Sequence, residues 1–266
     1  MKLNCIYLLL IGWIAFLFTN CSEYLGRKPE RIDRNVLDAL VRIATNAAAS
    51  SSCGRFSPEP IRGGVGQITG STNGIRQGFN LFGCSDSASL TSLGFPNENL
   101  QFTGNGVKGN ALNSRFASTA DYVTGGARHQ SFEATFTLDR SDGFLQIFTN
   151  ASANGASSDG PSVKITPSSI RPIFATGIEQ NFDGVPPSTP VGTVRTYCFD
   201  SHNESGNWHI LGWSRPCQVL TQQDRANGSQ EFSKLINTNQ PGSRVGFVLN
   251  GATIRSIIVG EMIAPH

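Results

Sequence analysis

The chain has 266 residues, and its 21 Lys and Arg nearly balance its 19 Asp and Glu. This balance creates no strong field for a polyanion, so nucleic acid is excluded as an expected partner. The composition of 29 Gly, 2 Met and 17 Phe against 4 Tyr favours short strands joined by many turns, and therefore an all-β fold.

An apolar run from Cys5 to Phe18 opens the chain, with Lys2 before it and Thr19-Asn20-Cys21-Ser22 after it. The run is too short to span a bilayer comfortably, because a spanning helix needs about 20 apolar residues. A basic residue, a short apolar core and a polar end are typical of a cleaved secretory signal. Residues 1–20 are therefore predicted to be a signal peptide, and the mature protein is expected to be exported.

The stretch Leu17-Phe18-Thr19-Asn20-Cys21 resembles a lipobox, the acylation motif of bacterial lipoproteins. Asn20 departs from the Gly, Ala or Ser that most lipoboxes carry there, and looser lipoboxes of this kind are familiar in spirochaetes such as Leptospira. The resemblance implies that Cys21 carries lipid and holds the protein on the outer membrane or cell surface. Residues 21–32 are predicted to be a tether, because the stretch after Cys21 is polar and contains Pro29. The alternative is an ordinary secretory cleavage beside an incidental Cys21.

Apolar residues recur at three- and four-residue spacing from Val36 to Ala48, after the potential cap Asp33. This period predicts one N-terminal amphipathic helix. The helix and lead-in strands are assigned to residues 33–95, and the main domain to residues 96–266. Few cations lie on the polar face of the helix, so it is expected to pack on the main domain and not on anionic lipid. An oligomerisation face is the other alternative.

Four cysteines remain in the mature chain if Cys21 is lipidated. They are Cys53, Cys84, Cys198 and Cys217. An even number of cysteines in an exported protein predicts two disulfides. Four cysteines allow three pairing schemes, and the scheme that joins the first to the second and the third to the fourth closes the shortest loops. Zinc is the weaker alternative, because its support is limited to His202 and His209 between the last two cysteines.

After the predicted helix, Asn-Gly and Asp-Gly turn signals recur between apolar segments. Phe132–Leu138 alternates apolar and polar residues, which predicts a strand with one buried face. Gly143–Phe148 is apolar on both faces and is expected to be central in a sheet. Val245–Leu249 and Ile254–Val259 flank Asn250–Gly251 and predict a hairpin.

The segment Gly104–Gly109 has the literal pattern G-x-G-x-x-G. A dinucleotide site needs a helix directly after the glycines and an acidic residue about 20 positions further on. Residues Asn113–Val123 have no helical stripe. A nucleotide is therefore not expected as a ligand.

Gly106–Leu112, Asp121–Val123 and Phe132–Leu138 resemble, in this order, the early strands of laminin-G or concanavalin A-like jelly rolls. Gly242–Gly251 and Ile257–Glu261 resemble the late strands. The resemblance implies an all-β main domain in which two antiparallel sheets pack face to face. This scaffold is used mostly for binding sugars or protein partners.

Some relatives in this superfamily are glycosidases, which need two carboxyl groups around the scissile bond. Their usual E-x-D-x-x-E strand is missing here, because Glu133 stands alone in its segment. The resemblance therefore implies a non-enzymatic protein that binds an extracellular glycan or a host matrix protein. Two alternatives stay open: a structural envelope lipoprotein without a soluble ligand, and a glycan hydrolase that has lost its usual motif.

The candidate ligand-binding residues are Trp208, His209 and Trp213, which follow a polar turn. An indole ring can stack on a sugar or anchor a protein contact. The two tryptophans are an odd number of positions apart, so in a regular strand they point to opposite faces and one is expected in the core. The alternative is that both are buried.

Calcium is the metal that the resemblance allows, since laminin-G relatives often hold it at a loop rim. The candidate ligands are Asp139, Asp142 and Asp159, which all lie near predicted turns. The alternative is that these carboxylates are simply solvated. No other cofactor is expected.

Overall fold

The computed structural model describes residues 52–58, 76–122, 130–152, 160–174, 177–204, 206–220, 222–225, 230–236 and 242–261, all within the unit Ser50–His266. The predicted signal peptide, Cys21, the N-terminal helix and Asp159 lie outside these residues. Within the described ranges, no helix is long and apolar enough to cross a membrane.

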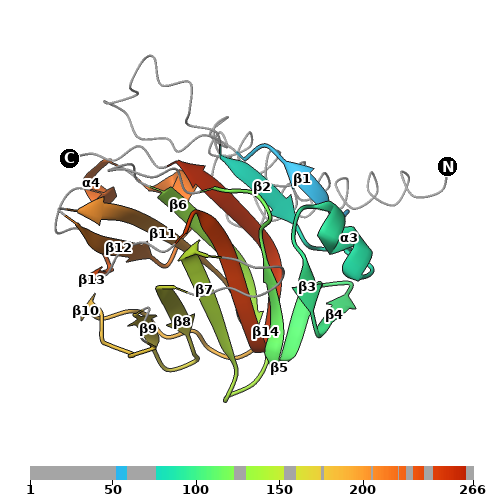
Figure 1. Ribbon diagram of the computed structural model, residues 1–266. Coiled ribbons are helices and arrows are strands. Elements are labelled where there is room, and N and C mark those ends of the chain that lie inside the picture. Colours follow the sequence, from blue (N-terminus) through green and yellow to red (C-terminus); the bar gives the residue numbers. More distant parts are fainter. Residues whose placement is uncertain are drawn as a thin grey trace, which may run out of the picture. The chain divides into compact units, whose positions relative to one another are not determined.

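The described strands pair into one antiparallel sheet of 14 strands with two halves (Figure 1). The first half contains, in spatial order, β10 (Asp183–Gly184), β13 (Phe232–Ile236), β12 (Asn207–Trp213), β11 (Val194–Glu204), β6 (Gln130–Leu138), β14 (Arg244–Glu261), β2 (Gln77–Asn80) and β1 (Gly54–Phe56). The second half contains β9 (Ile170–Ile173), β8 (Ser162–Ile165), β7 (Phe144–Ala151), β14 again and β5 (Gly106–Ala117), with β3 (Asn97–Glu98) and β4 (Leu100–Thr103) both paired to β5.

Short helices connect some of these strands. They are α3 (Ser87–Ser92), the 3-10 helix η1 (Cys217–Val219) and α4 (Gln222–Arg225). Helix α3 begins with a reciprocal cap in which the Ser89 amide donates to the Asp86 carboxylate at 2.8 Å and the Asp86 amide donates to Ser89 Oγ at 3.3 Å.

Strand β14 belongs to both halves of the sheet (Figure 1). Its residues up to Asn250 pair with β5 and β7, and those from Ser256 onward pair with β6 and β2. The predicted hairpin at Asn250–Gly251 is therefore wrong, because the chain bends there without reversing. Gly251 has a φ of 59° and the register with β5 shifts beside it, as in a β-bulge. An Asn-Gly pair permits positive φ in a turn and in a bulge alike.

The two halves enclose one hydrophobic core. The even-numbered residues of β6 from Phe132 to Leu138 are at most 2% exposed, as their alternation predicts. The ring of Phe247 lies 4.5 Å from that of Phe116 on β5 and 5.5 Å from that of Phe132 on β6, measured between centroids. The contact with Phe132 joins the second half to the first. The predicted all-β class and antiparallel sandwich are confirmed.

The last two glycines of the G-x-G-x-x-G segment, Gly106 and Gly109, allow β5 to approach β14 closely. Gly106 has a φ of 133°, and a Cβ atom there would overlap the carbonyl oxygen of Ile254. A Cβ atom at Gly109 would lie 2.5 Å from Cβ of Leu249, which is closer than such atoms approach in proteins. The glycines continue into a strand and not a helix, so they serve strand packing.

Both local disulfides are present, Cys53–Cys84 and Cys198–Cys217. The second one joins β11 to η1 and holds the segment after β12 against the outer side of the first half. A small apolar cluster forms there, made of Cys198, Leu211, Trp213, Cys217 and Leu220. The zinc alternative fails, because the last two cysteines are bonded to each other.

Candidate functional site

The predicted aromatic anchors are not exposed. Trp208 and Trp213 are both 0% exposed. Trp208 lies in the main core, where its Nε1 donates to Ser201 Oγ at 2.6 Å, and Trp213 lies in the small outer cluster, where its Nε1 donates to the Asp224 carbonyl at 2.9 Å. The two rings do lie on opposite faces. The prediction of a binding tryptophan is nevertheless wrong, because the disulfide-held segment covers the outer face at Trp213.

His209 is half-buried on β12 and lies opposite His202 of β11, with ring centroids 5.0 Å apart. His202 Nδ1 lies 3.4 Å from a carboxylate oxygen of Asp200. Over the part of the chain that the structure describes, no group of three or more His, Cys, Asp or Glu is arranged to hold a metal ion. Because both tryptophans are buried, His209 does not form a binding platform with them.

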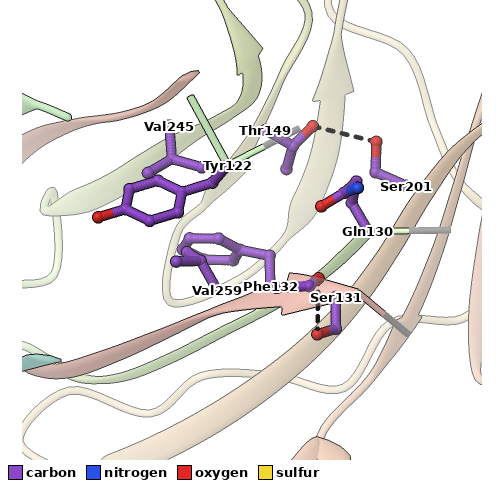
Figure 2. Close-up of a pocket in the computed structure, with 9 residues that line it drawn as sticks. Tyr122, Gln130, Ser131, Phe132, Thr149, Ser201, Val245 and Val259 are labelled. Carbon is purple, nitrogen blue, oxygen red and sulfur yellow. Dashed lines mark hydrogen bonds between the residues drawn. The ribbon is translucent and has the colours of Figure 1, made fainter. Parts of the chain in front are cut away.

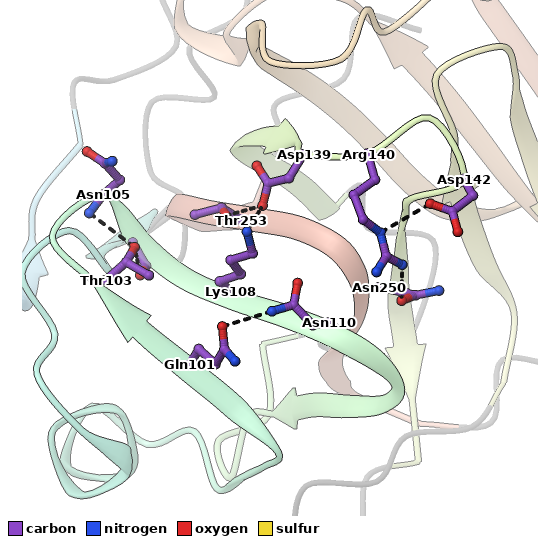
Figure 3. A network of polar contacts seen from close by, with 11 residues as sticks. Gln101, Thr103, Asn105, Lys108, Asn110, Asp139, Arg140, Asp142, Asn250 and Thr253 are labelled. Atoms are coloured by element: carbon purple, nitrogen blue, oxygen red, sulfur yellow. Dashed lines mark hydrogen bonds and ion pairs between the residues drawn. The ribbon is translucent and has the colours of Figure 1, made fainter.

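The described calcium candidates are each engaged by a cation (Figure 3). Asp139 lies 3.2 Å from Lys108 Nζ and accepts a hydrogen bond from Thr253 Oγ1 at 2.7 Å. Asp142 lies 3.1 Å from Arg140 Nε. The structure does not bring these two carboxylates into a common acidic cluster, and the third candidate lies outside the described residues.

A small cavity lies inside the sandwich (Figure 2). It is lined by Tyr122, Gln130, Ser131, Phe132, Thr149, Ser201, Val245, Val259 and Gly260. Its space is that of about one water molecule. A sugar ring does not fit in this cavity.

One row of side chains crosses the outer face of the second half of the sheet. By strand register it consists of Glu98, Arg115, Val248, Gln146, Lys164 and Arg171. All of these residues are half-buried or exposed. Directly opposed residues in an antiparallel sheet have Cβ atoms about 5 Å apart, so the row forms a continuous surface.

A second row lies beside it. Asn250 opposes Phe144 of β7 on one side and Asn110 of β5 on the other. Asn110 Nδ2 donates to Gln101 Oε1 at 2.8 Å, and Arg140 donates to Asn250 Oδ1 at 2.8 Å (Figure 3). Each of these three side-chain amides therefore uses either its nitrogen or its oxygen in a hydrogen bond within the protein. The second row thus consists of Gln101, Asn110, Asn250 and Phe144. We call the two rows together the polar face.

The charges of the polar face are largely paired. Arg115 donates two hydrogen bonds to Glu98, of 2.9 and 2.7 Å. Lys164 Nζ donates to Glu179 at 2.7 Å and lies 5.1 Å from the centroid of the Phe144 ring. The face is thus polar without carrying a large charge of one sign.

This combination of groups suits a polyhydroxyl ligand. A side-chain amide presents a donor and an acceptor side by side, and an aromatic ring presents apolar surface. Sequence reasoning missed the face, because each member is an ordinary outward residue of its own strand. Strand alternation could have marked Gln146 as outward within Gly143–Phe148, but it could not show which other residues lie next to it.

No protein-family model and no curated protein sequence matches the chain. Among solved structures, the exoplasmic/lumenal domain of VIP36 in its Ca²⁺/Man2-bound form is similar over 70% of this chain and 88% of that chain, with 8% identity and a TM-score of 0.41. The potassium-bound carbohydrate recognition domain of Emp46p matches over 68% and 94%, with 10% identity and a TM-score of 0.41. The carbohydrate binding module CBM66 from Bacillus subtilis matches over 64% and 94%, with 12% identity and a TM-score of 0.37. The description of this chain as an antiparallel β-sandwich rests on its own strand pairing.

Proposed function

We propose that the protein is a non-enzymatic, lipid-anchored protein of the cell envelope whose β-sandwich binds an extracellular glycan through the polar face. The observation that carries the binding proposal is the continuous double row of amide, guanidinium and aromatic side chains on one open sheet surface. Sugar hydroxyls both donate and accept hydrogen bonds. They therefore complement amide groups such as Gln146, whose Nε2 already donates to Ser162 Oγ at 2.8 Å and whose oxygen is an acceptor.

Binding without turnover is the expected activity. Glycoside hydrolysis needs one carboxyl group as acid and a second as nucleophile or base. On and beside the polar face, the described carboxylates of Glu98, Asp142 and Glu179 are each in an ion pair with a cation. The proposed contacts also need no cofactor, and calcium stays a prediction that a binding measurement with and without a chelator will test.

Phe144→Ala is expected to weaken glycan binding by about tenfold or more, because an aromatic anchor at the centre of a contact supplies a large share of its energy. The measurement is a glycan and matrix-protein array followed by titration, using the chain from Ser22 onward. The melting temperature should change by no more than about 5 °C, since Phe144 is only half-buried.

Phe56→Ala is the matched control, because Phe56 is 38% exposed and lies on β1 in the first half of the sheet. This variant should bind like the wild type. Binding to matrix proteins without glycan would favour the matrix partner instead. If the wild type binds nothing on the array, a structural envelope lipoprotein becomes the better account.

The lipid anchor has its own test. Cys21→Ala is expected to move the protein from the detergent phase to the soluble exported fraction, because two or more acyl chains hold a protein firmly on a membrane. Fractionation of a two-membrane host is expected to find the wild type in the outer membrane, since the residues after Cys21 are Ser22 and Glu23 and not an Asp retention signal. Unchanged partitioning of the variant would show that Cys21 is not lipidated.

A further inference from the structure

Two cations on the polar face share one carboxylate. Lys164 and Arg171 oppose each other on β8 and β9. Glu179 accepts a hydrogen bond from Lys164 Nζ at 2.7 Å through one carboxylate oxygen, and its other oxygen lies 3.7 Å from an Arg171 terminal nitrogen. The separation from Arg171 exceeds that of a hydrogen bond. The group of three side chains therefore carries one net positive charge, which lies at Arg171.

Arg171 differs in this respect from the other arginines around the face. Arg115 is satisfied by two hydrogen bonds to Glu98, and Arg140 donates to Asn250 and pairs with Asp142. Within the described ranges, Arg171 makes an ion pair with Glu179 and no hydrogen bond, and its side chain is 47% exposed. This half-exposed side chain lies on β9, the strand that ends the strand order of the second half.

We propose that Arg171, assisted by Lys164, binds the carboxylate of an acidic sugar in the glycan that the polar face takes, an inference that rests on the proposed function. The planar guanidinium group forms paired hydrogen bonds with a carboxylate, and such charge-assisted bonds are stronger than neutral ones. Lys164 links this anion site to the face, because its Nζ contacts both Glu179 and the ring of Phe144. A sugar ring over Phe144 would then direct its carboxylate toward Arg171.

The test uses two ligands with the same sugar chain, an oligosaccharide of galacturonic acid and its methyl ester, in which a methyl group replaces the negative charge of each carboxylate. Isothermal titration of the chain from Ser22 onward should give at least about tenfold tighter binding of the acid, in line with the strength of charge-assisted pairs. Arg171→Gln should abolish the difference between the two ligands. Arg215→Gln makes the same charge change away from the polar face, in the segment between β12 and η1 where Arg215 pairs with Asp224, and should preserve the difference.

The outcomes separate this inference from the proposed function. Equal binding of acid and ester by the wild type, with both weakened by Phe144→Ala, would overturn the acidic-sugar inference and leave glycan binding intact. Retained discrimination in Arg171→Gln would also overturn it. Dextran sulfate carries sulfate esters and no carboxylates, so binding of dextran sulfate that depends on Arg171, without binding of the galacturonic acid oligomer, would assign the site to a sulfate ester and not to a carboxylate. A wild type that binds no glycan on the array would instead refute the proposed function itself.

Discussion

Trp208→Ala is expected to lower the free energy of unfolding by about 3–5 kcal/mol, the usual cost of replacing a buried aromatic side chain with Ala. Trp208 is 0% exposed in the main core, and the change also removes the hydrogen bond to Ser201. For a domain of this size the melting temperature should fall by roughly 6–20 °C. The affinity of the remaining folded protein for its ligand should be unchanged. Denaturant unfolding and ligand titration on the same preparation measure both quantities.

The comparison with Phe144→Ala makes this prediction specific. Phe144 is half-buried on the polar face, so its variant should lose affinity with little loss of stability, the reverse of the Trp208 pattern. A stable Trp208→Ala protein with weakened binding would contradict the buried position of this ring. It would also restore the sequence-based expectation that Trp208 contacts the ligand.

Glu133→Ala is expected to lower the free energy of unfolding by a similar amount, about 3–5 kcal/mol, which is typical of breaking a buried charged pair. One Glu133 carboxylate oxygen accepts a hydrogen bond from the Cys217 amide at 2.7 Å and lies 3.5 Å from Arg76. The side chains of Glu133 and Arg76 are 9% and 5% exposed. The substitution removes the carboxylate from both partners at once, in a largely buried region.

Glu98→Ala is the control for this prediction. Glu98 also pairs with an arginine, Arg115 at 2.7 Å, but its side chain is 45% exposed. Solvent screens such a pair, so the loss should be about 0–1 kcal/mol. Equal losses for Glu98→Ala and Glu133→Ala would contradict the distinction between the exposed pair and the buried one. Chemical denaturation of both variants measures the two losses in the free energy of unfolding.

The buried carboxyl group also gives a pH signature. Burial raises the pKa of Glu133 above its ordinary value of 4.5, although the Cys217 amide and Arg76 act in the opposite direction. The folded state then holds the proton more tightly than the unfolded state, so this group's contribution to stability falls as the pH rises from about 4.5 toward the raised value. Unfolding free energies of the wild type and Glu133→Gln across this range should show a steeper fall in the wild type.

Several features follow from local sequence alone. The alternation of Phe132–Leu138 predicts one buried face because side chains of a strand point to opposite sides in turn. The even-numbered residues do form core, but Glu133 and Thr137 on the opposite face are buried as well, which local sequence does not predict. Each disulfide joins two successive cysteines of the chain, Cys53 with Cys84 and Cys198 with Cys217. Short loops close with the least loss of chain entropy, which favours this pairing. These predictions needed no information about which strands meet.

The sequence by itself therefore determined the all-β class and the inward face of a strand such as β6, because both depend on residues a few positions apart. Tertiary structure alone decided that Asn250–Gly251 bends one long strand, since the same dipeptide permits a turn or a bulge. It also decided that Trp213 is covered and that Gln146, Lys164 and Arg171 share one surface row. These outcomes depend on strand register and on which segment packs over a sheet face, and residues distant in the chain set both.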